Sequence, residues 1–125
     1  MYHDVVFFTL HVVGSNNNNA VTEGEAGDKC GRDDVASCAD QVDEYEARTV
    51  LNLEWMAEAF AWAKERSAKG VSVNWHANPG FDIQGTSIVE AETGAEDGSN
   101  GFTSTLSALW TAAKDFDGEV WLGAA

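Results

Sequence analysis

Three short apolar runs, separated by two amphipathic segments, set the hydrophobic pattern of this chain. The runs cover residues 5–13, 70–75 and 119–122, and a glycine lies at or next to one end of each of them. Short apolar runs of this kind are typical of strands, whereas the intervening segments repeat their apolar residues at helical spacing. The pattern therefore predicts an α/β fold in the order strand, helix, strand, helix, strand.

The first run, Val5 to Val13, carries apolar residues on both faces of the strand that it would form. Such a run indicates an interior strand covered on both faces, with neighbours on both edges. Unpaired edges of this strand would favour self-association. The turn-forming residues that follow Gly14 end the run.

In the second run, Val71, Val73 and Trp75 alternate with polar residues up to His76. This alternation predicts a strand with one face against a core. Pro79 follows closely and cannot donate to a ladder, so the strand ends at the histidine. Ligands of open α/β sheets bind beyond the carboxyl ends of strands, which makes His76 a candidate ligand. The alternative is a buried histidine that satisfies a backbone carbonyl.

A capping-box pattern, Asp43 with Glu46, predicts that the longer helix begins there and runs to about Ser67. Its Arg48 is expected to pair with an acid on the same helix, with a phosphate contact as the alternative. The helix has an apolar face made of Leu53, Met56, Phe60 and Ala63 and widened by Trp55, Ala59 and Trp62. Both tryptophans on this face are expected to pack in the core.

Apolar residues at helical spacing predict a second helix that begins near Ser99 or Asn100. Asp117 and Gly118 then end it before the third strand. The apolar positions of this helix are Phe102, Leu106, Leu109, Ala113 and Phe116.

Charge and length restrict the classes of protein and of partner. The 125 residues suit one domain, with surface insertions expected at 16–42 and 82–100. A net charge of −14 disfavours direct binding to nucleic acid and to anionic membranes unless metal ions intervene. No run approaches the roughly 18 apolar residues that span a bilayer. The first residues lack the basic segment of a signal peptide.

Cys30 and Cys38 lie in a stretch rich in glycine and aspartate. Without a second pair or a nearby histidine they fit a zinc site poorly, and a local disulfide is the favoured interpretation. A disulfide would place the protein in the periplasm or outside the cell. Two free thiols are the alternative.

The order of these elements, together with His76-Ala77-Asn78-Pro79 and Asn52-Leu53-Glu54-Trp55-Met56, resembles the C-terminal half of a calcineurin-like metallophosphoesterase. Leu10 to Asn17 is similar to a segment of one bacterial subgroup of these enzymes. The resemblance implies hydrolysis of phosphate esters by a water activated between two divalent ions of manganese, iron or zinc, with His76 as one metal ligand.

The resemblance covers only half of the family's domain. Where the family carries a Gly-His-x-His turn, this chain has Gly123-Ala124-Ala125, and the ligand segments of the first half of the family's domain are missing. The interpretation is a partial domain, residues 1–125, with an incomplete sheet of the metallophosphoesterase sandwich and no complete two-metal centre of its own. The second hypothesis is an inactive fragment that acts at most in binding or structure.

Four further residues are candidates for positioning the phosphate ester. His11 nears the end of a strand, with a core histidine as its alternative reading. Asparagine amides donate to phosphate and their carbonyls bind cations, although an asparagine run also forms simple turns. These candidates are His11, Asn16, Asn17 and Asn78.

Overall fold

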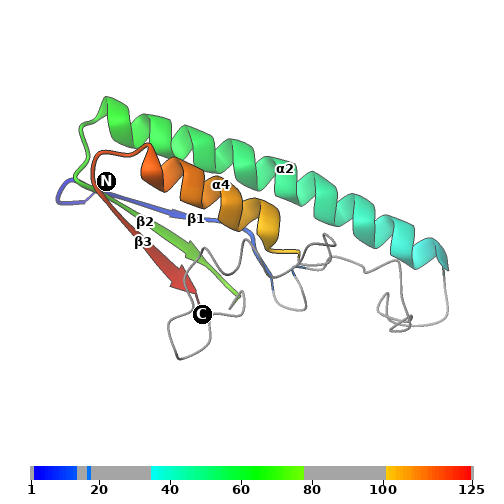
Figure 1. Cartoon of the computed structure of the whole chain (residues 1–125). Helices are drawn as coiled ribbons and strands as arrows, with labels where there is room; N and C mark the ends of the chain where they lie inside the picture. The colour runs from blue at the N-terminus through cyan, green and yellow to red at the C-terminus, as the bar shows by residue number, and fades with distance from the viewer. Residues whose placement is uncertain (1, 14–16, 18–34, 78–100, 125) are drawn as a thin grey trace.

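The structure is a computed structural model, and it describes residues 2–13, 17, 35–77 and 101–124 (Figure 1). The described chain is an α/β unit of three strands and two helices, which confirms the predicted class and order of elements. The strands are β1 (Val5–Thr9), β2 (Gly70–Trp75) and β3 (Glu119–Ala124), and the helices are α2 (Val35–Glu65) and α4 (Thr103–Lys114).

All three strands are parallel and stand in the order β1-β2-β3. In the described ranges each crossover includes one helix, and α2 and α4 lie together on one face of the sheet (Figure 1). Right-handed crossovers that step in one direction across a sheet place their helices on the same face. The helices therefore leave the second face, here called the open face, without a helical layer in the described part of the chain.

Alternation along the strands sorts side chains between the two faces. Val71, Val73 and Trp75 are buried, as the pattern predicts. On α2, the ring of Phe60 makes edge-to-face contacts with Phe8 and with Phe116 at centroid distances of 6.1 and 5.8 Å. Edge-to-face pairs stabilise a core beyond the area that they bury. These aromatic contacts join α2 to β1 and to the segment that follows α4.

The open face carries Phe7, Ser72 and Trp121 in one row, because the register pairs Phe7 with Ser72 and Ser72 with Trp121. Phe7 is 57% exposed and Trp121 is 45% exposed. Thr9 is also exposed. The prediction that the first strand is covered on both faces is therefore wrong at Phe7 and Thr9.

The outer edge of β1 is occupied at both of its ends. Directly after β1, Leu10 N donates to the carbonyl of Asn74 at 2.9 Å. Because the main-chain groups of successive residues point to opposite sides of a strand, those of Val5 and Thr9 point to the outer edge. On the outer side, Val5 exchanges two hydrogen bonds of 2.9 Å with Tyr2. Trp55 Nε1 donates to the carbonyl of Thr9 at 3.1 Å. Self-association through strand edges stays a prediction, and these contacts shorten the edge of β1 that is open to it.

The structure also moves three predicted boundaries. The strand ends at Thr9 instead of Val13, and α4 begins at Thr103 instead of near residue 100. Helix α2 begins at Val35 instead of Asp43, so residues 35–42 of the predicted insertion are helical. The capping-box pattern is wrong as a start signal because the helix continues on its N-terminal side.

Trp55 departs from its assignment to packing. Its ring meets Phe8 edge-to-face at 6.5 Å, but the residue is 49% exposed. The other tryptophan of that prediction, Trp62, is partly buried against the core, as predicted.

Two sequence predictions fall outside the described residues. One is the 82–100 insertion, and the other is the disulfide, since Cys30 and the side chain of Cys38 are not described.

Candidate functional site

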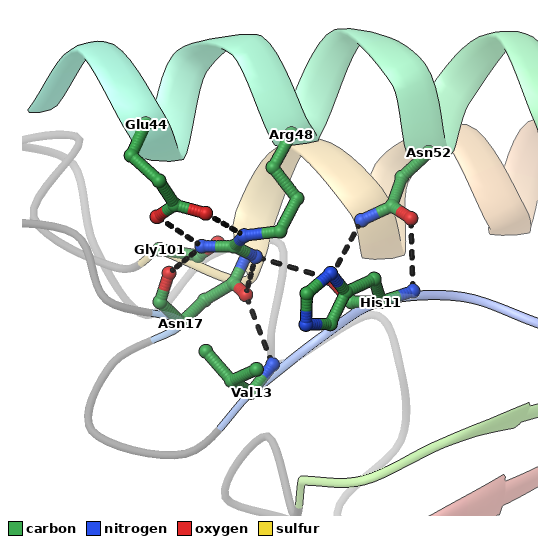
Figure 2. A network of polar contacts seen from close by, with 7 residues as sticks. All are labelled: His11, Val13, Asn17, Glu44, Arg48, Asn52 and Gly101. Carbon is green, nitrogen blue, oxygen red and sulfur yellow. Dashed lines mark hydrogen bonds and ion pairs between the residues drawn. The ribbon is translucent and has the colours of Figure 1, made fainter. Parts of the chain in front are cut away.

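Arg48 organises a polar network where the chain leaves β1 (Figure 2). Arg48 is 7% exposed, and its side chain reaches from α2 to the main chain of His11 and to Asn17. Nη1 donates to the carbonyl of His11 at 3.0 Å and to Asn17 Oδ1 at 2.6 Å, and Nη2 donates to the carbonyl of Asn17 at 2.7 Å. Nε and Nη2 donate to the carboxylate of Glu44 at 2.6 and 3.2 Å.

These bonds use every N–H of the guanidinium. The predicted salt bridge within the helix is confirmed, since Arg48 and Glu44 are one turn apart on α2. A phosphate contact would require Arg48 to release one of its present partners. The side chain therefore acts as a clamp between α2 and the segment after β1.

Asn52 lies one turn further along α2 and binds the main chain of His11 twice. The N–H of His11 donates to Asn52 Oδ1, and Asn52 Nδ2 donates to the carbonyl of His11, both at 2.9 Å. An amide side chain used in this way replaces the peptide group of a neighbouring strand. Asn52 thus continues the edge contacts of β1 past the end of the strand.

Asn17 links the same segment to the start of α4. Its Oδ1 accepts from Val13 N at 3.2 Å, and its Nδ2 donates to the carbonyl of Gly101 at 2.9 Å. The residue is fully buried and has φ 54, a left-handed conformation that asparagine tolerates. Of the predicted phosphate-positioning residues, Asn17 is therefore bound to protein groups, and Asn16 and Asn78 lie outside the described residues.

The two candidate histidines leave neighbouring strands at the same level. Thr9 pairs with Asn74 in the register of β1 and β2, and His11 and His76 each follow two positions later. Both residues are exposed. The alternative reading of His11 as a core histidine is therefore wrong, and so is that of His76 as a buried one.

An open hollow of about 720 Å³ lies between the end of β1 and α2. Glu44 and Arg48 contribute its charged groups, and Leu51 and Trp55 contribute apolar surface. Because Arg48 is bound on all its donors, the hollow offers an approaching anion no free guanidinium N–H. The hollow is lined by Thr9, Leu10, His11, Glu44, Ala47, Arg48, Leu51, Asn52 and Trp55.

The described part of the chain lacks the ligand set of a two-metal centre. Such a centre needs several carboxylate and imidazole ligands around two close cations. Within the described ranges, no group of three or more histidine, cysteine, aspartate or glutamate side chains could hold a metal ion. An exposed histidine fits the role of a single ligand, but the described residues do not fit a complete two-metal centre.

Sequence reasoning missed the roles of Arg48 and Asn52 toward His11. A signal was present, because Arg48, Asn52, Met56 and Phe60 stand at successive helical turns on one face. Polar residues that continue a buried apolar row indicate buried polar partners.

Comparison of the chain with protein-family models, curated proteins and solved structures found no match. In the part of the chain that the structure describes, no helix combines the length and the apolar character needed to cross a lipid bilayer.

Proposed function

We propose that the chain forms part of a metal-dependent phosphoesterase of the calcineurin-like class, in which His76 binds a divalent manganese, iron or zinc ion. The observation that carries the proposal is the exposed position of His76 directly after β2, at the carboxyl edge of a parallel sheet. Ligands of open parallel sheets bind at this edge. The sequence resemblance around His76 supplies the reaction class.

The chain's own contributions to such a site are limited and specific. His76 supplies an imidazole nitrogen, while Arg48 and Asn52 fix the main chain of the neighbouring segment. When bound, divalent ions polarise the phosphate ester and activate water. A protein of net charge −14 repels an anionic ester, so bound cations would also be needed to attract the substrate. A complete two-metal centre would need ligands from outside the described residues.

The alternative function is non-catalytic, as a binding or structural fragment. Two observations favour it: within the described residues no three-ligand group occurs, and the open face exposes Phe7 and Trp121. An uncovered face on a parallel sheet suits contact with another layer of protein.

Hydrolysis of an aryl phosphate by the full chain, supplied with Mn²⁺ or Zn²⁺, tests the proposal. If the activity resides in this chain alone, we expect metal-dependent turnover that His76→Ala abolishes. His3→Ala is the matched control, because His3 precedes β1 at the opposite end of the sheet and should not alter turnover. Absence of turnover with either metal would favour the inactive fragment, and equal turnover in His76→Ala would contradict the role of His76.

A further inference from the structure

We propose that His11 is a second ligand beside His76, and that the two imidazoles together bind one divalent transition-metal ion at the carboxyl edge of the sheet. The inference rests on the proposed role of His76 in metal binding. It gives His11 a metal contact in place of the substrate contact expected from the sequence.

The register of the sheet carries the first step. His11 and His76 each stand two residues beyond the paired Thr9 and Asn74. Neighbouring strands lie about 4.8 Å apart, and side chains an even number of positions apart share a face. The burial pattern continues this alternation past the strand ends, to Val12 and to Ala77, so both histidines fall with Phe7 on the side of the open face. Two imidazoles so spaced can reach one ion at metal–nitrogen distances of about 2.0–2.1 Å.

The main chain of His11 is fixed, while its side chain is exposed. Asn52 holds both the N–H and the carbonyl of His11 at 2.9 Å, and Arg48 binds the same carbonyl at 3.0 Å. All three contacts engage main-chain atoms, so they leave the imidazole available. A ligand whose backbone is already ordered loses less conformational entropy on binding.

The two imidazole ligands favour a transition-metal ion over magnesium or calcium. Imidazole nitrogen suits zinc, cobalt and nickel, whereas magnesium and calcium prefer oxygen ligands. The chain's 21 acidic side chains offer many oxygen ligands to hard cations. A site made by His11 and His76 should therefore bind Co²⁺ in the presence of excess Mg²⁺, while the acidic surface is occupied by Mg²⁺.

The test is a Co²⁺ titration of the full chain in excess Mg²⁺, followed by paramagnetic effects on the histidine ring signals in NMR spectra. We expect one Co²⁺ to broaden the rings of His11 and His76 together and to leave His3 unaffected. His11→Ala and His76→Ala should each lower Co²⁺ affinity by about tenfold or more, because loss of one ligand removes the chelate. His3→Ala is the matched control and should bind as the unmodified chain does.

The variants separate this inference from a folding effect. His11→Ala retains the contacts of Asn52 and Arg48, since these use main-chain atoms. Its urea midpoint should match that of the unmodified chain. Unchanged Co²⁺ affinity in His11→Ala would overturn the inference, as would broadening of His11 and His76 at different metal concentrations.

The same variants distinguish this inference from the proposed function. Co²⁺ binding that needs both histidines, without phosphate ester hydrolysis, would support the metal site and contradict the phosphoesterase. Hydrolysis that needs His76, with neither binding nor turnover altered by His11→Ala, would contradict the two-histidine site and support the phosphoesterase.

Discussion

The stretch of helix α2 from Arg48 to Ala63 uses its two halves in different ways. Its C-terminal half packs Met56, Phe60 and Ala63 against the sheet as an apolar core. Its N-terminal half instead points Arg48 and Asn52 at the main chain beyond β1. Apolar packing tolerates exchange among side chains of similar volume, whereas a buried polar contact depends on the position of each donor and acceptor. The comparison shows that one helix can both build the core and fix a candidate ligand segment.

The largest expected effect comes from Arg48→Ala. The substitution removes the hydrogen bond to the carbonyl of Asn17, one of two donors to Asn17 Oδ1 and to the carbonyl of His11, and the ion pair with Glu44. We expect the free energy of unfolding to fall by about 2–4 kcal/mol, mainly from the hydrogen bonds of the buried guanidinium, because Glu44 is half exposed and its ion pair contributes little. Urea denaturation followed by circular dichroism measures the change. Arg48→Lys, which keeps the charge but not the fork of donors, should recover only part of the loss.

Asn52→Leu and Met56→Leu form a matched pair, one from each half of the stretch between Arg48 and Ala63. Asn52→Leu leaves the N–H and carbonyl of His11 without the side chain that binds both, and should cost about 1–3 kcal/mol. Met56→Leu keeps the volume of a core residue and should cost less than about 1.5 kcal/mol. Thermal unfolding of the two variants provides the comparison. A smaller loss in Asn52→Leu than in Met56→Leu would refute the division of α2 into a polar and an apolar half.

Trp55 stands between the two halves, and Trp55→Phe should have an intermediate effect. The variant keeps an aromatic ring near Phe8 but loses the hydrogen bond from Nε1 to the carbonyl of Thr9. A cost of about 0.5–1.5 kcal/mol is expected for one such bond. Hydrogen exchange gives a more local readout, in which the amides of β1 should exchange faster than those of β2. Equal acceleration in both strands would argue against a specific contact at the edge of β1.

The smallest effect is expected at the exposed pair of Lys64 and Asp115, which joins the end of α2 to the end of α4. The hydrogen bond and charge of Lys64 lower the pKa of Asp115 below its usual 3.8. A carboxyl whose pKa is lower in the folded state stabilises the fold above the unfolded pKa, and the contribution is lost as pH falls through the folded pKa. Asp115→Asn should therefore lower the melting temperature slightly at pH 7 and leave it unchanged well below pH 3.8. An equal change at both values would contradict an electrostatic origin.

Local sequence patterns predicted the elements better than the contacts between them. Alternation identified Val71, Val73 and Trp75 as one buried face, because a strand's side chains alternate wherever its neighbours lie. The end of β1 could not be predicted in the same way. Residues 10–13 are apolar enough for a strand, but the main chain of His11 binds a helix side chain that is distant in sequence.

In the candidate site, too, local patterns predicted one position, and contacts between distant segments determined the others. Hydrophobic alternation and the following proline placed His76 at the end of a strand, and β2 ends at Trp75. The parallel register that brings His11 to the same level depends on pairing between strands that are distant in sequence. The partners of Asn17 are also distant in sequence, Arg48 by 31 residues and Gly101 by 84, so its burial could not be predicted from an asparagine run.

X-ray absorption at the zinc edge, on the full chain loaded with one equivalent of Zn²⁺ in excess Mg²⁺, most directly tests whether the carboxyl edge of this sheet binds metal through histidine. We predict scattering from two imidazole rings with nitrogen at about 2.0–2.1 Å, reduced to one ring in His11→Ala and in His76→Ala. A shell of oxygen atoms alone, unchanged in both variants, would show that zinc binds the acidic surface and would contradict the account.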